Sequence, residues 1–306
     1  MSALLAGSAI VTGAGSGLGQ ATSVAFARHG IQKLALIDLN STGMQITEEL
    51  IRKAVGDQTE LLSIEADISD EASVIGAMKS AAKKFGRIDI AINNAGVGGP
   101  IKPSTETSLE EYRKVIDINT IGLWLCQREE LKQMLSQDPI QVRPGIQSRG
   151  VIVNVASIFG LTGSAPWTPA TPYSTSKHGV IAITKNDANT YAKEGIRINA
   201  ICPGFVKSDS LEAAVSTSDI MRKELNKIPM DRLASTEEIA EAIVFLASSM
   251  SSFMTGSSLV VDGSVALSAK LHKQTLTTEA EVIWLIEGEA KVSSQRRDHR
   301  AWDLAH

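Results

Sequence analysis

The sequence TGAGSGLG fills residues 12–19, between the apolar run Ala9–Thr12 and a helical pattern that begins near residue 17. Glycine lets bare backbone come close to a phosphate group, and the free N–H groups at the start of the next helix carry a partial positive charge. A glycine-rich turn alone is a weak signal, but one that joins a strand to a helix is typical of dinucleotide binding. The stretch therefore predicts a strand–turn–helix unit that holds a pyrophosphate.

Beyond this unit, short β-branched runs alternate with longer helical patterns, which is typical of βαβ units and a parallel sheet. Strands are expected at Ala9–Thr12, Lys33–Asp38, Leu61–Ala66, Ile88–Asn93, Val151–Ala156, Arg197–Cys202 and Ser258–Asp262. Helices are expected near residues 17–29, 43–55, 70–85, 106–135 (in two pieces), 173–194 and 235–248. The predicted fold is α/β: a Rossmann-type, doubly wound, parallel seven-stranded sheet with helices on both faces.

Two segments depart from this alternation. Ser136–Arg149 contains two prolines and a glycine, which predicts a surface loop without chemistry. Residues 266–306 hold six basic residues, six acidic residues and three of the five histidines, unlike the rest of the chain. We expect one NAD-binding catalytic domain over residues 1–265 and an appended C-terminal tail over residues 266–306. For the tail, a loose extension, a subunit contact and a lid all remain open.

Composition excludes several classes of protein. The 306 residues are 43% hydrophobic and carry a net charge of -4, which suits one large core and argues against nucleic-acid binding. Cys126 and Cys202 lie in no Cys-x-x-Cys arrangement, so we expect neither disulfides nor a metal site, as fits a reducing cytoplasm. No positively charged leader precedes the first apolar run, and serines interrupt residues 242–261, so we expect no membrane partner.

Asp38 ends the second predicted strand, about twenty residues beyond the glycines, where dinucleotide-binding folds place an acid against the adenosine ribose. A carboxylate there would repel a 2′-phosphate by several kcal/mol at an effective dielectric of about 20. Neither Ser16 nor Leu39 supplies a compensating positive charge. The residue predicts NAD rather than NADP. Asp67, after the third strand, suits either the adenine amino group or a helix cap, and Asn93–Gly96 suits either the adenosine or a plain turn.

Ser157 follows the fifth predicted strand, and Tyr173 and Lys177 open the next helix. Residues four apart share a helix face, and an ammonium about 4 Å from a phenol would contribute about 4 kcal/mol, or about three pKa units. We therefore expect Lys177 to bring the pKa of Tyr173 from about 10 toward 7. Such a phenol exchanges protons efficiently with a carbinol or carbonyl oxygen, which Ser157 could hold by hydrogen bond.

Taken in order, the motifs resemble those of the short-chain dehydrogenase/reductase family. The resemblance covers about residues 6–265. It rests on the glycine turn, on NNAG (Asn93–Gly96), Asn119, Ser157 and YxxxK (Tyr173 to Lys177), and on Pro203-Gly204 and Val261–Gly263. The interval between Ser157 and Tyr173 is longer than is common in the family, and Asp231 replaces a glycine that usually precedes the arginine. These departures concern the substrate lip and a nearby loop.

The resemblance implies a role for each matching residue. Tyr173 would be the acid/base, Lys177 would lower its pKa and bind the nicotinamide ribose, Ser157 would orient substrate, and Asn119 would hold a water that relays protons. The pyrophosphate would lie among Gly13, Ser16, Gly17, Leu18 and Gly19. The remaining cofactor contacts would be Asp38 (ribose), Asp67 and Ile68 (adenine), Asn94, Ala95 and Gly96 (adenosine), and Pro203, Gly204, Val206 and Ser208 (nicotinamide side).

The sequence thus predicts an NAD-dependent oxidoreductase for a mostly apolar secondary alcohol or ketone, located in the cytoplasm. The family resemblance further implies a homotetramer or dimer. The alternatives are a 3-oxoacyl thioester reductase that uses NADPH and a non-catalytic dinucleotide-binding protein. We interpret His178 and both cysteines as structural. Several apolar side chains either line the substrate pocket or pack as a lid: Phe159, Trp167, Phe205, Met221 and Met230.

Overall fold

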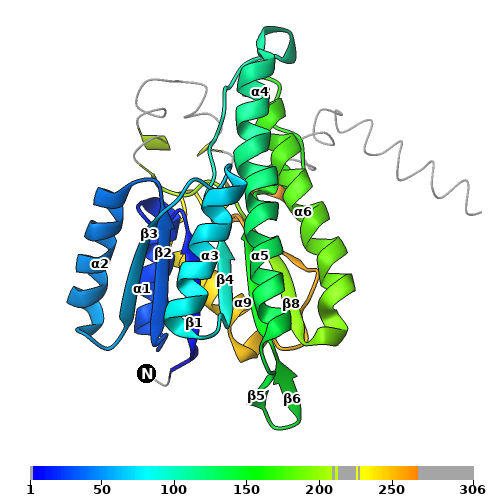
Figure 1. Ribbon diagram of the computed structural model, residues 1–306. Coiled ribbons are helices and arrows are strands. Elements are labelled where there is room, and N and C mark those ends of the chain that lie inside the picture. Colours follow the sequence, from blue (N-terminus) through cyan, green and yellow to red (C-terminus); the bar gives the residue numbers. More distant parts are fainter. Residues whose placement is uncertain (1–2, 209–210, 213–224, 227, 268–306) are drawn as a thin grey trace, which may run out of the picture.

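A seven-stranded sheet forms the centre of the computed structural model, in the order β3-β2-β1-β4-β7-β8-β9 (Figure 1). The structure describes residues 3–208, 211–212, 225–226 and 228–267. All neighbouring strands in this sheet are parallel. The strands are β1 (Ser8–Thr12), β2 (Lys33–Asp38), β3 (Glu60–Glu65), β4 (Ile90–Asn93), β7 (Gly150–Val155), β8 (Ile196–Pro203) and β9 (Ser258–Val261). The predicted Rossmann-type fold is confirmed.

The main helices follow the strands as the sequence predicts. They are α1 (Gly17–Arg28), α2 (Ser41–Val55), α3 (Glu71–Phe85), α4 (Leu109–Ile116), α5 (Leu123–Ser136), α6 (Thr171–Tyr191) and α9 (Thr236–Ala247). Four of them begin at a side chain that accepts a hydrogen bond from a first-turn N–H: Asn40, Asp70, Ser108 and Ser235. Such caps satisfy backbone donors that a helix start leaves free, so they fix where each helix begins.

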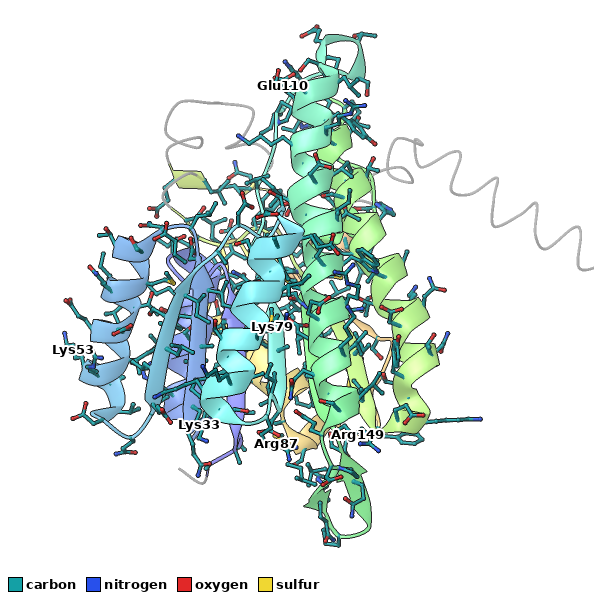
Figure 2. All side chains as sticks on the ribbon, viewed as in Figure 1. Lys33, Lys53, Lys79, Arg87, Glu110 and Arg149 are labelled. Carbon is teal, nitrogen blue, oxygen red and sulfur yellow. The ribbon has the colours of Figure 1, made fainter. Side chains whose placement is uncertain are left out.

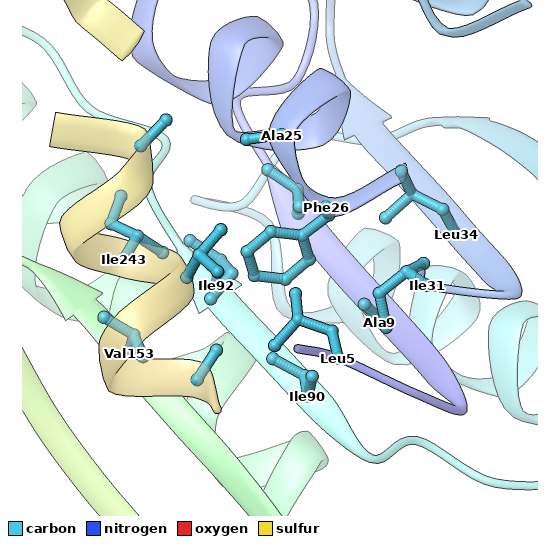
Figure 3. Packing of buried hydrophobic residues seen from close by; sticks show 14 of the residues in the cluster. Leu5, Ala9, Ala25, Phe26, Ile31, Leu34, Ile90, Ile92, Val153 and Ile243 are labelled. Carbon is cyan, nitrogen blue, oxygen red and sulfur yellow. The ribbon is translucent and has the colours of Figure 1, made fainter. Parts of the chain in front are cut away.

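Helices cover both faces of the sheet because alternate strand residues point to opposite faces. On one face, Ala9 and Val11 pack with Phe26 of α1 and with α9 (Figure 3). On the other face, Ile10 packs against α3 and α5. Charged side chains such as Lys53 and Lys79 lie on the outer surfaces of the helices (Figure 2). Two apolar layers therefore hold a sheet whose carboxyl ends meet at a single edge.

The prediction of a loop over Ser136–Arg149 is wrong for most of its length. Here β5 (Ile140–Arg143) and β6 (Ile146–Ser148) pair antiparallel and project beyond the end of α5 (Figure 1). Gly145 adopts a positive φ of 74° in the turn between them. The loop was predicted because Pro144 has no N–H group to donate to a neighbouring strand. A Pro-Gly turn between segments that contain β-branched residues is, however, also compatible with a hairpin.

The predicted long helix over residues 106–135 is confirmed in two pieces, α4 and α5. A π-helical turn, Asp117–Gly122, joins them without a break. Such turns interrupt regular helices often at functional sites, and this one carries Asn119. Among the described helices, none combines the length and apolar character needed to cross a bilayer. Met221 and nearly all of the predicted tail lie outside the described residues.

Candidate active site

One cavity of about 350 Å³ lies at the carboxyl edge of the sheet. Ser157 reaches it from the end of β7, and Tyr173 and Lys177 reach it from the first turns of α6. The structure thus brings together three of the four predicted catalytic residues. Besides Tyr173 and Lys177, seven of the predicted cofactor residues line the same cavity: Leu18, Asn94, Gly96, Pro203, Gly204, Val206 and Ser208.

Lys177 is 5% exposed, and its ammonium donates to the carbonyl of Val155 at 2.8 Å. The Nζ atom lies 5.6 Å from the centre of the Tyr173 ring, so the predicted shared helix face is present. Burial lowers the pKa of Lys177 to about 8, because an ammonium removed from water loses solvation. This side chain therefore exchanges its proton close to neutral pH.

Tyr173 differs from the expectation. Burial raises the pKa of Tyr173 above its ordinary value, and a hydrogen bond with Ser157 only partly opposes that rise. The expected lowering of this pKa toward 7 by Lys177 is therefore wrong for the chain by itself. The Coulomb estimate counted the attraction between phenolate and ammonium but omitted the cost of burying each charge. Tyr173 is consequently a neutral phenol at physiological pH.

Asn119 is fully buried beside this cavity without lining it. Its amide donates to the Val97 carbonyl at 2.8 Å and to the Ser176 hydroxyl at 3.1 Å, and it accepts the Val97 N–H at 2.8 Å. A Cβ built on Gly96 would lie 3.0 Å from Asn119 Oδ1 and 3.7 Å from Lys177 Nζ. The residue therefore ties the loop after β4 to the start of α6, and its water relay stays a prediction.

The glycine turn leads from β1 into α1, as expected. Gly13 and Gly17 have positive φ values of 68° and 51°, which L side chains rarely adopt. A Cβ on Gly19 would clash with the carbonyl oxygen of Gly13, so α1 starts against bare backbone. Asn94 donates its side-chain N–H groups to the carbonyls of Thr12 and Gly13 at 3.0 and 3.2 Å. One asparagine thus both braces the turn and lines the cavity.

Asp38 is half-buried beside this turn. Its carboxylate accepts the N–H groups of Gly15 and Asn40 at 2.8 and 2.9 Å. The structure therefore places an acid where the ribose of a dinucleotide was predicted, while contact with ribose stays a prediction.

Asp67 accepts the N–H and the hydroxyl of Ser69 at 2.8 and 2.7 Å, whereas Asp70 caps α3. The alternative of Asp67 as the helix cap is therefore wrong. Ile68 is buried, and its carbonyl lies close to Gly122 of the π-helical turn. The backbone N–H of Ala95 donates to the Thr12 hydroxyl at 3.1 Å. The adenine and adenosine contacts of these residues remain predictions.

Two aromatic side chains line the cavity next to the tyrosine. Phe159 meets Tyr173 edge to face at 6.4 Å between ring centres, and Phe205 meets Phe159 at 6.3 Å. Trp167 and Met230 are 50% and 59% exposed and do not line the cavity. The sequence left pocket lining and lid packing open for this group, and among its described members Phe159 and Phe205 line the cavity. Val97, Ile158 and Leu211 also line it; position beside a motif was the one signal that could have found them.

The comparisons agree with this geometry. The sequence profile of a family described as enoyl-(acyl carrier protein) reductase matches residues 13–265. The short-chain dehydrogenase fogB of Aspergillus ruber is 36% identical over 273 residues, which cover 87% of this chain and 98% of that protein. This chain belongs to the short-chain dehydrogenase/reductase family.

Two solved structures extend the likeness to the fold. NAD+-bound xylitol dehydrogenase is 30% identical with a TM-score of 0.74, over 83% of this chain and 97% of that one. A putative 2-deoxy-d-gluconate 3-dehydrogenase from Agrobacterium tumefaciens with bound NADP is 30% identical with a TM-score of 0.72, over 85% and 96%. This short-chain dehydrogenase/reductase is accordingly an oxidoreductase that acts on alcohols or ketones and binds a nicotinamide dinucleotide.

Proposed function

We propose that this protein moves a hydride between NAD and a mostly apolar secondary alcohol or ketone. One observation carries the proposal: Ser157, Tyr173 and Lys177 line a single cavity at the carboxyl edge of the sheet. This edge is where open α/β sheets bind ligands. The glycine turn leads into the same region, since Leu18 and Asn94 share the cavity with the three catalytic side chains.

The residues of this edge fit a nicotinamide dinucleotide. A Cβ on Gly13 would clash with Asn94, and one on Gly19 would clash with the Gly13 carbonyl, so the turn packs closely on bare backbone, while the position of a Cβ on Gly17 is open space that a phosphate could occupy. We assign the pyrophosphate to Gly13, Ser16, Gly17, Leu18 and Gly19, the adenosine half to Asp38, Asp67, Ile68, Asn94, Ala95 and Gly96, and the nicotinamide half to Tyr173, Lys177, Pro203, Gly204, Val206 and Ser208. When bound, the nicotinamide ring supplies the hydride acceptor or donor.

Side chains of this protein transfer the proton to or from the substrate oxygen. In reduction, the neutral Tyr173 hydroxyl donates its proton to the carbonyl oxygen; in oxidation, the phenolate takes the proton of the carbinol. Ser157 hydrogen-bonds the same oxygen and stabilises its developing charge. Lys177, held by the Val155 carbonyl, stabilises the phenolate and contacts the ribose. Asn119 positions the start of α6 through Ser176 and holds the water that relays protons.

This assignment predicts how rate depends on pH. Because burial raises the pKa of Tyr173, the reactive phenolate is a minor species near neutrality and grows about tenfold per pH unit. We expect kcat/KM for alcohol oxidation to rise with pH from 6 to 9, while kcat/KM for ketone reduction stays nearly flat until Lys177 titrates. Initial rates in both directions measure this, and an oxidation rate that falls with pH would contradict it.

Asp38 supports NAD over NADP. Its carboxylate already sits at the turn, held by Gly15 and Asn40, so a 2′-phosphate would meet a fixed negative charge. Comparing kcat/KM for NAD and NADP tests this, and a preference for NADP would overturn the cofactor assignment.

The cavity walls support an apolar substrate. Among the described residues that line it, Lys177 carries the one formal charge, while Phe159, Phe205 and Ile158 supply apolar surface. A free carboxylate or phosphate on the substrate would find no second cation among these described residues. We therefore expect turnover of 1-phenylethanol and cyclohexanol to exceed that of 3-hydroxybutyrate. An absorbance screen for NADH formation over this panel is the experiment, and sole turnover of the charged alcohol would refute the substrate class.

We further propose that residues 1–265 form the catalytic domain, that the protein works in the cytoplasm, and that it assembles as a homotetramer or dimer through the helices of residues 106–135 and 173–194. The exposed side chains of Ile121 and Trp124, at and beside the start of α5, support such packing, since they are 43% and 42% exposed. Sedimentation measures the assembly.

A further inference from the structure

A buried carboxyl group lies outside the active-site cavity, between α5 and the ends of β4 and β7. Glu130 of α5 is 0% exposed, and its Oε2 accepts the side-chain N–H of Asn93 at 2.9 Å. Its other oxygen, Oε1, is buried without a hydrogen-bond partner, and the same holds for Oδ1 of Asn93. Among the described residues, a carboxylate in this position would have no cation beside it and one oxygen without a donor, which is costly.

Glu130 belongs to a cluster of uncharged polar side chains. Asn93 also donates to Asn154 at 3.0 Å, and Asn154 donates to Gln127 and Thr184 at 2.7 and 2.9 Å. All five side chains are at most 2% exposed. The cluster has two oxygens without donors, so a proton on Glu130 supplies a donor that the ionised form cannot.

Few ionisable groups surround this cluster. On α5 itself, Cys126 is buried, and Arg128 pairs with Glu71 of α3 and with Glu129. From α6, Asp187 accepts from Gln127 at 2.6 Å and Tyr191 packs nearby. From the sheet, Asn93 and Asn154 are neutral. In the part of the chain that the structure describes, no cation compensates Glu130, and burial raises the pKa of Glu130 to about 8.

The cluster holds the strand ends that build the active site. Asn93 and Asn154 are directly paired in the β4–β7 register. The residue after Asn93 is Asn94, which braces the glycine turn, and the residue after Asn154 is Val155, whose carbonyl accepts the Lys177 ammonium. A shift of Asn93 therefore moves its neighbour Asn94 and the glycine turn, and a shift of Asn154 moves its neighbour Val155 and the bound Lys177.

We propose that Glu130 is a positioning residue that works as a neutral carboxylic acid, holding Asn93 and Asn154 so that the ends of β4 and β7 present Asn94 and Val155 to the cofactor site. Ionisation of Glu130 disturbs these strand ends and weakens cofactor binding. Proton binding at Glu130 and NADH binding are thus coupled, and such couplings are typically 5-fold or more. The proposal rests on the proposed cofactor site but not on the identity of the substrate.

The sign of the stability effect follows from the raised pKa. Between pH 4.5 and 8, native Glu130 keeps a proton that the unfolded chain has released, so its contribution to the free energy of unfolding falls as pH rises. One such proton makes the folding equilibrium constant drop about tenfold per pH unit. Glu130→Gln keeps the shape and the acceptor for Asn93 but cannot ionise, so the variant lacks this slope.

The decisive experiment compares wild type with Glu130→Gln, with Glu129→Gln as the matched control. Glu129 is the preceding residue and pairs with Arg128 and Lys132, so it is ionised at neutral pH. The infrared difference spectrum between wild type and Glu130→Gln at pH 6 should show the C=O stretch of a neutral carboxylic acid, lost above pH 8. Its absence at pH 6 would overturn the proposal.

The second readout is the Kd for NADH, measured by fluorescence from pH 6 to 9.5. Lys177 titrates in both proteins, so the ratio of wild-type Kd to Glu130→Gln Kd isolates Glu130. We expect this ratio to rise about 5-fold or more over the range, and to stay constant between wild type and Glu129→Gln. A constant ratio for Glu130→Gln would mean that the residue is merely structural. Failure of either protein to bind NADH at any pH would instead refute the cofactor site itself.

If Glu130→Gln does not fold, a measurement on the wild-type protein alone still tests the proposal. Unfolding at pH 6 should release about one proton from Glu130, measured by calorimetry in two buffers with different ionisation enthalpies. No net proton release would contradict a neutral native carboxyl group.

Discussion

Lys177 and Glu130 are two buried ionisable groups beside neighbouring strand ends: Lys177 contacts the end of β7, and Glu130 contacts the end of β4. Burial lowers the pKa of Lys177 and raises that of Glu130, each to about 8. Lys177 lines an open cavity, whereas Glu130 does not and is 0% exposed. The same cost of burying a charge therefore brings the pKa of an ammonium in the cavity close to neutral pH and keeps an enclosed carboxyl group in its neutral form.

The two clusters also differ in what surrounds them. The open cluster, formed by Ser157, Tyr173 and Lys177, combines two hydroxyl groups with an aromatic wall of phenylalanine side chains. A reacting oxygen can therefore be bound there away from water. The closed cluster consists of amides, a hydroxyl and one acid that hydrogen-bond to each other: Asn93, Gln127, Asn154, Thr184 and Glu130. Access to a cavity, rather than the size of a pKa shift, therefore distinguishes Lys177 from Glu130 in this protein.

Removing the ammonium group of Lys177 should have the largest effect on activity. We expect Lys177→Met to lower kcat/KM by about 10²- to 10⁴-fold, the range for losing a group that supports acid/base catalysis. Its free energy of unfolding at pH 7 should stay within about 2 kcal/mol of wild type, because relief of the buried charge offsets the lost bond to Val155. Steady-state kinetics and urea unfolding measure both quantities. Lys185→Met, an exposed lysine on the same helix, is the control and should keep full activity.

Asp38 carries a negative charge on a half-buried side chain and belongs to neither the open nor the closed cluster. Asp38→Asn removes the repulsion of a 2′-phosphate, so the ratio of kcat/KM for NADP to that for NAD should rise about 10- to 100-fold. Glu65, its partner in the β2–β3 register, is the matched control, and Glu65→Gln should leave the ratio unchanged. Equal changes in both variants would show that general charge, not Asp38, sets the preference.

The aromatic wall of the open cluster should give the smallest effect. Phe159→Leu removes the edge-to-face contact with Tyr173 and one face for a flat substrate, so kcat/KM for 1-phenylethanol should fall about 2- to 10-fold relative to 2-butanol. Phe253→Leu replaces a fully exposed phenylalanine far from the cavity and should change neither rate. A uniform loss for both alcohols would assign Phe159 to packing alone.

Sequence patterns predicted the fold and the open cluster because both leave local signals. Strands alternate with helices, and Tyr173 and Lys177 lie four residues apart on one helix face. The closed cluster leaves no such signal, since Asn93, Glu130 and Asn154 come from separate elements and meet only in the folded chain. Glu130 sits in the run Arg128-Glu129-Glu130, which looks like a solvated helix surface.

Two further features differ from the prediction, each for its own reason. The raised pKa of Tyr173 depends on burial, which pairwise spacing does not contain. The hairpin over residues 140–148 was hidden by Pro144, although its β-branched residues flank a Pro-Gly turn. Motifs therefore predict which residues meet, while burial decides what their ionisable groups do.

Tyr173→Phe tests the account most directly, because it removes the one oxygen that exchanges a proton with substrate and leaves the ring in place. We expect turnover of every alcohol in the panel to fall by about 10²- to 10⁴-fold, while the Kd for NADH, measured by fluorescence, changes little. Near-normal turnover in this variant would contradict the assignment of Tyr173 as the acid/base.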